Sequence, residues 1–254
     1  MRSAGSSGVV RRGPLRSAVI GICAAAVLLI ASSMPAHAQG KRAELEGVWI
    51  VNGTRTENLK LTPDGAAARA RYDHLHHDPA MQCIPATFKR VMHTPSPPIE
   101  VKLHEDYAEI NYEFMDVHRR VPIKNGLAAK DAPYTVSRFP HLGRSAGHWE
   151  GDTLVIESTD LKAGLLDSLG DPGLWQSDQM QTVERFVPNG NRMQVIVRMT
   201  DPVNFVEPFT TTFNYLKLPD GQLLTWDCVP EEAGYNRFNE NAPRQPLPLR
   251  NNQQ

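Results

Sequence analysis

Apolar and polar residues alternate along most of this chain, with the period of two that is typical of half-buried β-strands. Short polar turns join many of these segments, which favours antiparallel hairpins, and closing such a sheet would remove its exposed edges. The pattern therefore predicts a mainly β protein, an antiparallel, lipocalin-like barrel of about ten strands. The predicted strands are residues 45–51, 99–104, 107–114, 117–123, 147–149, 153–158, 180–187, 193–200, 209–218 and 223–229.

Three kinds of segment interrupt this alternation. One early helix is predicted, with Thr62 as its N-cap, Pro63 as its first residue and its end at Asp78-Pro79. Two long rim loops are predicted at residues 124–144 and 160–179, since long loops are often binding rims or lids. Residues 240–254 are predicted to be a disordered tail. No linker divides residues 39–239, which we expect to form a single β-barrel domain.

Residues 1–38 have the pattern of a secretory signal peptide. Basic residues precede an apolar run at 18–30, and Ala36-His37-Ala38 supplies the small residues that signal peptidase needs. About 14 apolar residues are too few for a membrane span, which needs roughly 20. We expect cleaved export, a periplasmic or secreted protein, and no stable membrane insertion after cleavage. Arg11-Arg12 weakly resembles a twin-arginine signal.

Composition narrows the choice of partners. The formal net charge is −1, with 22 % charged and 41 % hydrophobic residues. The first 38 residues hold four arginines and no acid, so the remainder carries a net charge of about −5. These values exclude a multi-span membrane protein and wholesale disorder, and we expect no nucleic-acid partner.

Two cysteines, Cys83 and Cys228, follow the expected cleavage site. In an oxidising compartment a disulfide between them is the default expectation, and a free reactive pair is the alternative. Closing so long a loop would stabilise the fold by roughly 4–5 kcal/mol in the chain-entropy model.

Hairpin turns predict which side chains share a face, because a two-residue loop fixes the register of its strands. A turn at Asn189-Gly190 puts Glu184 and Thr182 on the apolar face, which should point inward. Turns at Glu105-Asp106 and Met115-Asp116 put Tyr112 and Arg119 inside as well. The predicted partners are Phe186 with Met193, Glu184 with Val195, Thr182 with Val197, and Tyr112 with Arg119.

A fourth turn, at Asp220-Gly221, would pair Tyr215 with Trp226 and Phe213 with Cys228 on one aromatic inward face. The predicted ligand contacts are therefore Thr182, Tyr215 and Trp226, together with Phe139 and His141 in the first long loop.

Arg119 and Glu184 are expected to have partners, because a buried unpaired charge costs several kcal/mol. They could form an ion pair that braces the barrel, or Arg119 could cover Trp49. As a functional site, Arg119 would orient an anionic or carbonyl group, Tyr112 would donate a hydrogen bond, and Glu184 would be a general acid or base.

Weaker candidates lie elsewhere. His74 and His77 would meet at helical spacing and could begin a metal site, although histidines at a helix C-terminus also interact with its dipole. Glu150 and Asp152 flank Gly151 and could be paired carboxylates, but a hairpin tip is the favoured interpretation. No cofactor is predicted.

The stretch from Gly147 to Val155, Gly-His-Trp-Glu-Gly-Asp-Thr-Leu-Val, resembles the signature of a family of exported Gram-negative bacterial proteins. That family is essentially uncharacterised, so the resemblance implies export and no reaction. Further similar elements are Cys83-Ile84-Pro85, Ile110-Asn111-Tyr112-Glu113, His118-Arg119, Val183-Glu184-Arg185-Phe186, Asp201-Pro202, and Cys228 followed by Glu231.

A weaker resemblance connects Gly47-Val48-Trp49 to the Gly-x-Trp that opens lipocalin-like barrels. There the tryptophan closes one end, usually under an arginine from the last strand. Residues 223–229, the predicted last strand, contain no arginine.

These patterns favour an exported barrel that binds a small, apolar or aromatic molecule, with Arg119, Tyr112 and Glu184 as its polar contacts. The alternative is an enzyme of the same shape, a cofactor-independent lyase, isomerase or hydratase working by acid–base catalysis. A third possibility is a structural envelope protein that binds a partner through its rim loops.

Overall fold

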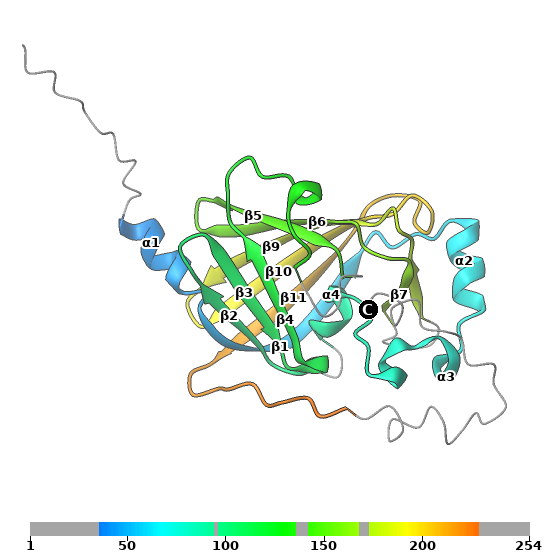
Figure 1. Cartoon of the computed structure of the whole chain (residues 1–254), viewed down its shortest axis with the longest axis horizontal. Helices are drawn as coiled ribbons and strands as arrows, with labels where there is room; N and C mark the ends of the chain where they lie inside the picture. The colour runs from blue at the N-terminus through cyan, green and yellow to red at the C-terminus, as the bar shows by residue number, and fades with distance from the viewer. Residues whose placement is uncertain (1–35, 94–95, 136–141, 168–172, 229–254) are drawn as a thin grey trace, which may run out of the picture. The chain divides into compact units, whose positions relative to one another are not determined.

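Nine antiparallel strands form the main sheet of the computed structural model, which describes residues 36–93, 96–135, 142–167 and 173–228. Figure 1 shows the strands curving around a common interior. Their order across the sheet is β4 (Val117–Pro122), β3 (Tyr107–Tyr112), β2 (Ile99–Leu103), β1 (Gly47–Glu57), β11 (Phe209–Leu218), β10 (Arg192–Thr200), β9 (Gln181–Asn189), β6 (Thr153–Thr159) and β5 (Arg144–Glu150).

The two outermost strands, β4 and β5, also meet. Ile123 and Gly147 form a parallel bridge, and the N–H of Lys124 donates to the carbonyl of Gly147 at 3.0 Å. The sheet therefore closes almost completely, which leaves few unpaired edge groups. This confirms the predicted mainly β, nearly closed antiparallel barrel.

The inward face of β9 and β10 is as predicted, although their register is not. Asn189 pairs with Arg192, so the two-residue turn is Gly190-Asn191, and Val197 lies opposite Glu184 in place of Val195. The shift is two residues. Because side chains alternate with a period of two, a shift of two keeps every side chain on its face.

The connection between β3 and β4 differs in the same way. A short 3-10 turn, η2 (Phe114–Asp116), replaces the expected two-residue loop, and Met115 and Asp116 both have positive φ. Arg119 therefore pairs with Ile110 and not with Tyr112. It still points inward. The Glu105-Asp106 turn is confirmed, with Ile99 opposite Tyr112.

The predicted strand at residues 223–229 is wrong over its described part, because residues 223–228 are not in a strand. β11 instead pairs with the distant β1, with Val48 opposite Leu218. The expected pairs Tyr215–Trp226 and Phe213–Cys228 therefore do not form. The apolar alternation of this segment reflects packing, since Trp226 and Cys228 contact the hydrophobic core without joining the sheet.

The predicted loop at residues 160–179 contains a second sheet of two strands, β7 (Gly164–Asp167) and β8 (Leu174–Gln176). The loop at 124–144 contains a 3-10 turn, η3 (Ala129–Asp131), and ends where β5 begins. β7 and β8, with four and three residues, are too short to show a period in the sequence.

The early helix is split in two. α2 (Pro63–Ala70) begins as predicted, with the Thr62 hydroxyl accepting from the N–H of Gly65. Asp73 then interrupts it, because its carboxylate accepts from the N–H of His76 at the start of α3 (His74–His77). Asp78 caps the following turn, η1 (Pro79–Gln82). A four-residue helix, α4 (Phe88–Val91), was not predicted.

One end of the barrel is closed around Trp49, which is fully buried and donates from its indole N–H to the carbonyl of Leu45. The ammonium of Lys217, on β11, lies 4.9 Å from the centre of the Trp49 ring. The cation over Trp49 thus comes from Lys217 on β11, the last strand among the described residues, and not from Arg119.

The hairpin of β5 and β6 packs against α1 (Ala36–Ala43), the helix that precedes Leu45 and Trp49. Arg42 of α1 donates through Nε and Nη2 to the carbonyl of Gly151 and lies 4.3 Å from the centre of the Trp149 ring. Gly151 has a φ of +60°, as the tip of a hairpin requires. Glu150 and Asp152 are therefore tip residues, and Glu150 pairs with Arg185.

Candidate functional site

Arg119 and Glu184 form an ion pair inside the barrel, as their inward faces predict. Arg119 is 1 % exposed and Glu184 is 1 % exposed. Two parallel hydrogen bonds join them, from Nη2 to Oε1 at 2.6 Å and from Nη1 to Oε2 at 2.8 Å. This two-fold contact is the strongest geometry for a guanidinium and a carboxylate.

Two serines also contact Arg119. Its Nη2 shares its second N–H between the hydroxyls of Ser145 and Ser158, at 3.0 Å each, and these hydroxyls lie 2.7 Å apart. Its Nε is buried and has no hydrogen-bond partner among the described residues. Both serines were missed from the sequence. The signal that could have found them is the β5–β6 hairpin, in which they pair directly and face inward.

Tyr112 lies beside the pair but contacts it weakly. Its hydroxyl accepts from Arg119 Nη1 at 3.5 Å. Burial raises the pKa of Tyr112 well above its usual range, and the positive charge of Arg119 offsets this only in part. Burial alone would lower the pKa of Arg119, but the attraction of Glu184 raises it overall. Both groups therefore hold their protons at any physiological pH.

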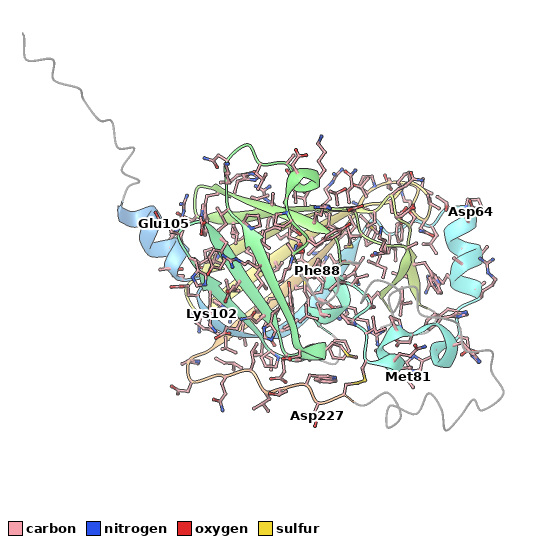
Figure 2. All side chains as sticks on the ribbon, viewed as in Figure 1. Asp64, Met81, Phe88, Lys102, Glu105 and Asp227 are labelled. Carbon is pink, nitrogen blue, oxygen red and sulfur yellow. A yellow bond between two sulfur atoms is a disulfide. The ribbon has the colours of Figure 1, made fainter. Side chains whose placement is uncertain are left out.

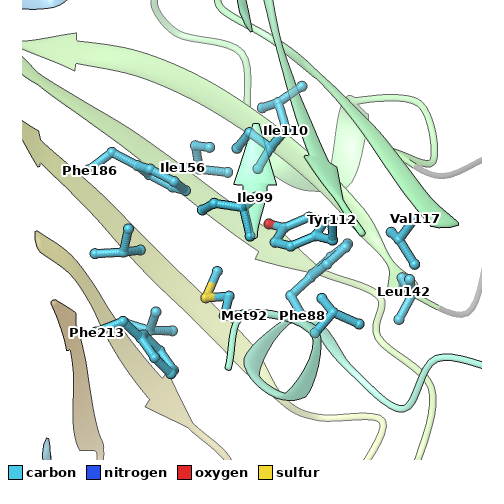
Figure 3. Packing of buried hydrophobic residues seen from close by; sticks show 14 of the residues in the cluster. Phe88, Met92, Ile99, Ile110, Tyr112, Val117, Leu142, Ile156, Phe186 and Phe213 are labelled. Carbon is cyan, nitrogen blue, oxygen red and sulfur yellow. The ribbon is translucent and has the colours of Figure 1, made fainter. Parts of the chain in front are cut away.

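A side chain from outside the sheet covers this ion pair. Phe88, the first residue of α4, places its ring 3.9 Å from the guanidinium carbon of Arg119 and stacks on Tyr112 with ring centres 6.3 Å apart. Figure 3 shows Phe88 beside Tyr112, with Leu142 and Met92 next to it. α4 thus fills the barrel interior next to this ion pair, and we call this helix the cap.

Buried ion pairs hold the cap in place. Lys89 pairs with Asp167 of β7, and Arg90 pairs with Asp78. The imidazole Nε2 of His93 lies 3.6 Å from the same Asp167 carboxylate. Burial would raise the pKa of Asp167, but the bond from His93 and the charge of Lys89 outweigh burial and lower it well below its usual value.

A small void lies between the cap and the barrel wall, with a volume of about 10 Å³. That is room for about one water molecule. Two of its polar atoms, Thr182 Oγ1 and Gln176 Oε1, are buried and have no hydrogen-bond partner among the described residues. The lining is otherwise mostly apolar, and consists of Thr87, Phe88, Lys89, Met92, Leu161, Leu166, Gln176, Thr182, Glu184, Val197 and Met199.

The void brings together only some of the predicted ligand contacts. Thr182 lines it with Glu184. Tyr215 is buried nearby and donates to the carbonyl of Met92 at 2.7 Å, just after the cap. Trp226 instead packs edge-on against Phe114, with ring centres 4.9 Å apart, away from the lining. Phe139 and His141 lie outside the described residues.

The predicted disulfide is confirmed, with Cys83 and Cys228 bonded and their Cα atoms 5.7 Å apart (Figure 2). His74 and His77 have separate partners: His74 lies 3.3 Å from Asp78, and His77 accepts from the N–H of Asp73. Throughout the described ranges, no group of three His, Cys, Asp or Glu side chains is placed to hold a metal ion.

A wider groove, of about 290 Å³, lies on the outer face of β9, β10 and β11. Its lining is Asn52, Val187, Asn189, Arg192, Met193, Gln194, Asn214, Tyr215 and Leu216. The buried charges lie on the other side of the sheet, under the cap. We therefore place the candidate site in the interior.

Within the described part of the chain, the helices are all too short to cross a membrane. Comparison with protein-family models gives no match, and comparison with curated proteins gives none either. Among solved structures, the chain is similar to apo lipid binding protein 8 of Caenorhabditis elegans, with 11 % identity, a TM-score of 0.35, and coverage of 69 % of this chain and 96 % of that one. The barrel itself rests on the strand pairings described above.

Proposed function

We propose that this protein binds a small, largely apolar or aromatic molecule inside the barrel, at the ion pair of Arg119 and Glu184. The observation that carries the proposal is the position of Phe88. Its ring comes from a short helix outside the sheet, yet it occupies the inside of the barrel on the guanidinium of Arg119. A small barrel either fills its interior with its own side chains or encloses a ligand, and here the filling side chain belongs to a separable element.

The attachment of the cap supports this reading. Thr87 donates to the carbonyl of Leu166, and Lys89 and Arg90 reach carboxylates outside the main sheet. These bonds join α4 to β7 and to the turn at Asp78, and the hydroxyl of Tyr215 on β11 adds one bond from the barrel, to the carbonyl of Met92 directly after α4. The cap can therefore leave the barrel without breaking the strand ladders.

Binding fits the polar groups better than acid–base chemistry does. Both oxygens of Glu184 accept from Arg119, and the raised pKa of Arg119 keeps that partner charged. A general acid must carry a transferable proton, and a general base needs an oxygen directed at substrate. The lyase, isomerase or hydratase alternative stays a prediction that would require this pair to open.

We further propose that the protein acts outside the cytoplasm. The Cys83–Cys228 disulfide is compatible with an oxidising compartment. The predicted signal peptide and the resemblance to an exported Gram-negative family support the same location.

The test is titration of the purified protein with N-phenyl-1-naphthylamine, an uncharged aromatic probe whose fluorescence rises in apolar surroundings. We expect saturable binding of one probe per chain. Thr182→Phe should abolish it, because the new ring would fill the void and the space next to Glu184. Thr212→Phe is the matched control, since Thr212 lies on β11 between two buried neighbours and is itself half-buried on the outer face.

Two results would contradict the proposal. One is a fluorescence increase that rises linearly with probe and never saturates. The other is an unchanged affinity in Thr182→Phe when circular dichroism shows that the variant is folded.

A further inference from the structure

The ring of Phe88 indicates what a ligand at this site must resemble. It presents its face to the planar guanidinium of Arg119 at 3.9 Å, with the Tyr112 ring alongside at an interplanar angle of 28°. A guanidinium plane stacks favourably on a flat π-face and gains less from an alkyl chain. A molecule that replaces Phe88 on this surface therefore needs an aromatic ring.

The charges around the site favour an uncharged molecule. Each described cation near the void already has a carboxylate: Arg119 has Glu184, Lys89 has Asp167, and Arg90 has Asp78. The Nε atoms of Arg119 and Arg90 are the donors of these groups that have no acceptor among the described residues. A carboxylate ligand would have to displace one of these acids or remain unpaired in an apolar interior. Either outcome is unfavourable, because a buried charge without a partner costs several kcal/mol.

Two polar groups that line the void have no hydrogen-bond partner among the described residues. Gln176 is 4 % exposed, and its amide nitrogen already donates to the carbonyl of Lys162 at 2.7 Å. Its Oε1 is left as a buried acceptor without a partner among the described residues, and Thr182 Oγ1 is in the same state. Both residues line the void together with Phe88. A hydroxyl or amino group on the ligand would satisfy Gln176 Oε1 and remove the cost of leaving it unpaired.

We infer that the ligand is a neutral, planar aromatic molecule with a hydrogen-bond-donating substituent, that its ring takes the place of Phe88 on Arg119, and that its donor bonds Gln176. This inference rests on the proposed function. It makes Phe88 a competitor of the ligand, so removing the Phe88 ring strengthens binding, whereas removing an ordinary contact residue weakens it.

The test compares the affinities of three probes for the purified protein by calorimetry: 2-naphthol, naphthalene-2-carboxylate and decanoate. We expect 2-naphthol to bind at least about tenfold more tightly than either anion, from the cost of an unpaired buried charge. Gln176→Met should weaken the binding of 2-naphthol by about three- to tenfold, the usual effect of losing one hydrogen bond. Gln194→Met, at an exposed outer position of β10, is the matched control.

Phe88→Leu and Phe88→Ala test the competition. Both should bind 2-naphthol more tightly than the wild type, and Phe88→Leu keeps enough apolar volume to guard against unfolding. Phe209→Ala is the control, because it opens an equivalent cavity beside Phe205 in another part of the core.

Several outcomes overturn the inference while leaving the proposed function intact. They are tighter binding of either anion than of 2-naphthol, an unchanged affinity of Gln176→Met for 2-naphthol, and equal affinities of Phe88→Ala and Phe209→Ala for 2-naphthol. If N-phenyl-1-naphthylamine and all three probes fail to bind saturably, the proposed function itself is wrong.

Discussion

Replacing Arg119 with methionine should destabilise the protein more than almost any other single change. Methionine keeps the length of the side chain and removes the donors, so Glu184 remains buried at 1 % exposure without its two hydrogen bonds. Breaking a buried pair in this way typically costs 3–5 kcal/mol, about a third of the stability of an ordinary domain. We expect Arg119→Met to lose about that much free energy of unfolding.

The double variant Arg119→Met/Glu184→Met should recover most of this loss. It leaves an apolar interior, and well-packed apolar replacements of buried ion pairs are often neutral. The two serine hydroxyls keep a partner, since Ser145 and Ser158 lie 2.7 Å apart, and Tyr112 loses only its long 3.5 Å contact with Arg119. The two single changes should therefore be non-additive by at least about 2 kcal/mol.

The measurement is equilibrium unfolding in urea at neutral pH, followed by tryptophan fluorescence with the disulfide intact. Arg185→Met is the matched control, because the pair of Arg185 with Glu150 is exposed and should contribute little. A loss in Arg119→Met no larger than that in Arg185→Met would contradict a stabilising role of the buried pair, and so would a double variant that loses the sum of the two single losses.

Three further predictions concern other parts of the fold. Replacing Cys83 and Cys228 by serine should lower the free energy of unfolding by about 2–5 kcal/mol in urea titrations, and an unchanged midpoint would contradict it. The pKa of Asp167 is lower in the folded protein, so its contribution to the free energy of unfolding is full above about pH 4 and is lost as pH falls further. Asp167→Asn should therefore reduce the change in the free energy of unfolding between pH 5 and pH 3, measured by urea titration at each pH. Lys217→Met should lose about 0.5–1 kcal/mol and alter the emission of Trp49, unlike an exposed lysine such as Lys130.

Local sequence rules predicted the inward faces correctly even where the turns were misplaced. Arg119 and Glu184 are buried together because a two-residue error in register does not change the face of a strand. The pattern failed at residues 223–228, where alternation came from core packing of Trp226 and Cys228. Nothing local distinguishes that alternation from a strand that pairs with β11.

The cap could not have been predicted from the sequence. α4 has four residues, too few to show a helical period, and its anchors are distant: Lys89 and Asp167 are 78 positions apart. The cation on Trp49 was missed for the same kind of reason, since Lys217 reaches it only through the pairing of β1 with β11. Contacts of this sort depend on which strands become neighbours.

The disulfide limits how far the cap can travel. Cys83 lies five residues before Phe88, and an extended chain spans about 3.5 Å per residue, so an undocked Phe88 stays within roughly 18 Å of the Cys83–Cys228 bridge. A group on so short a tether has an effective concentration on the order of millimolar at its own docking site. Any molecule that enters the barrel must compete with that local concentration, which makes the tether length a determinant of the apparent affinity.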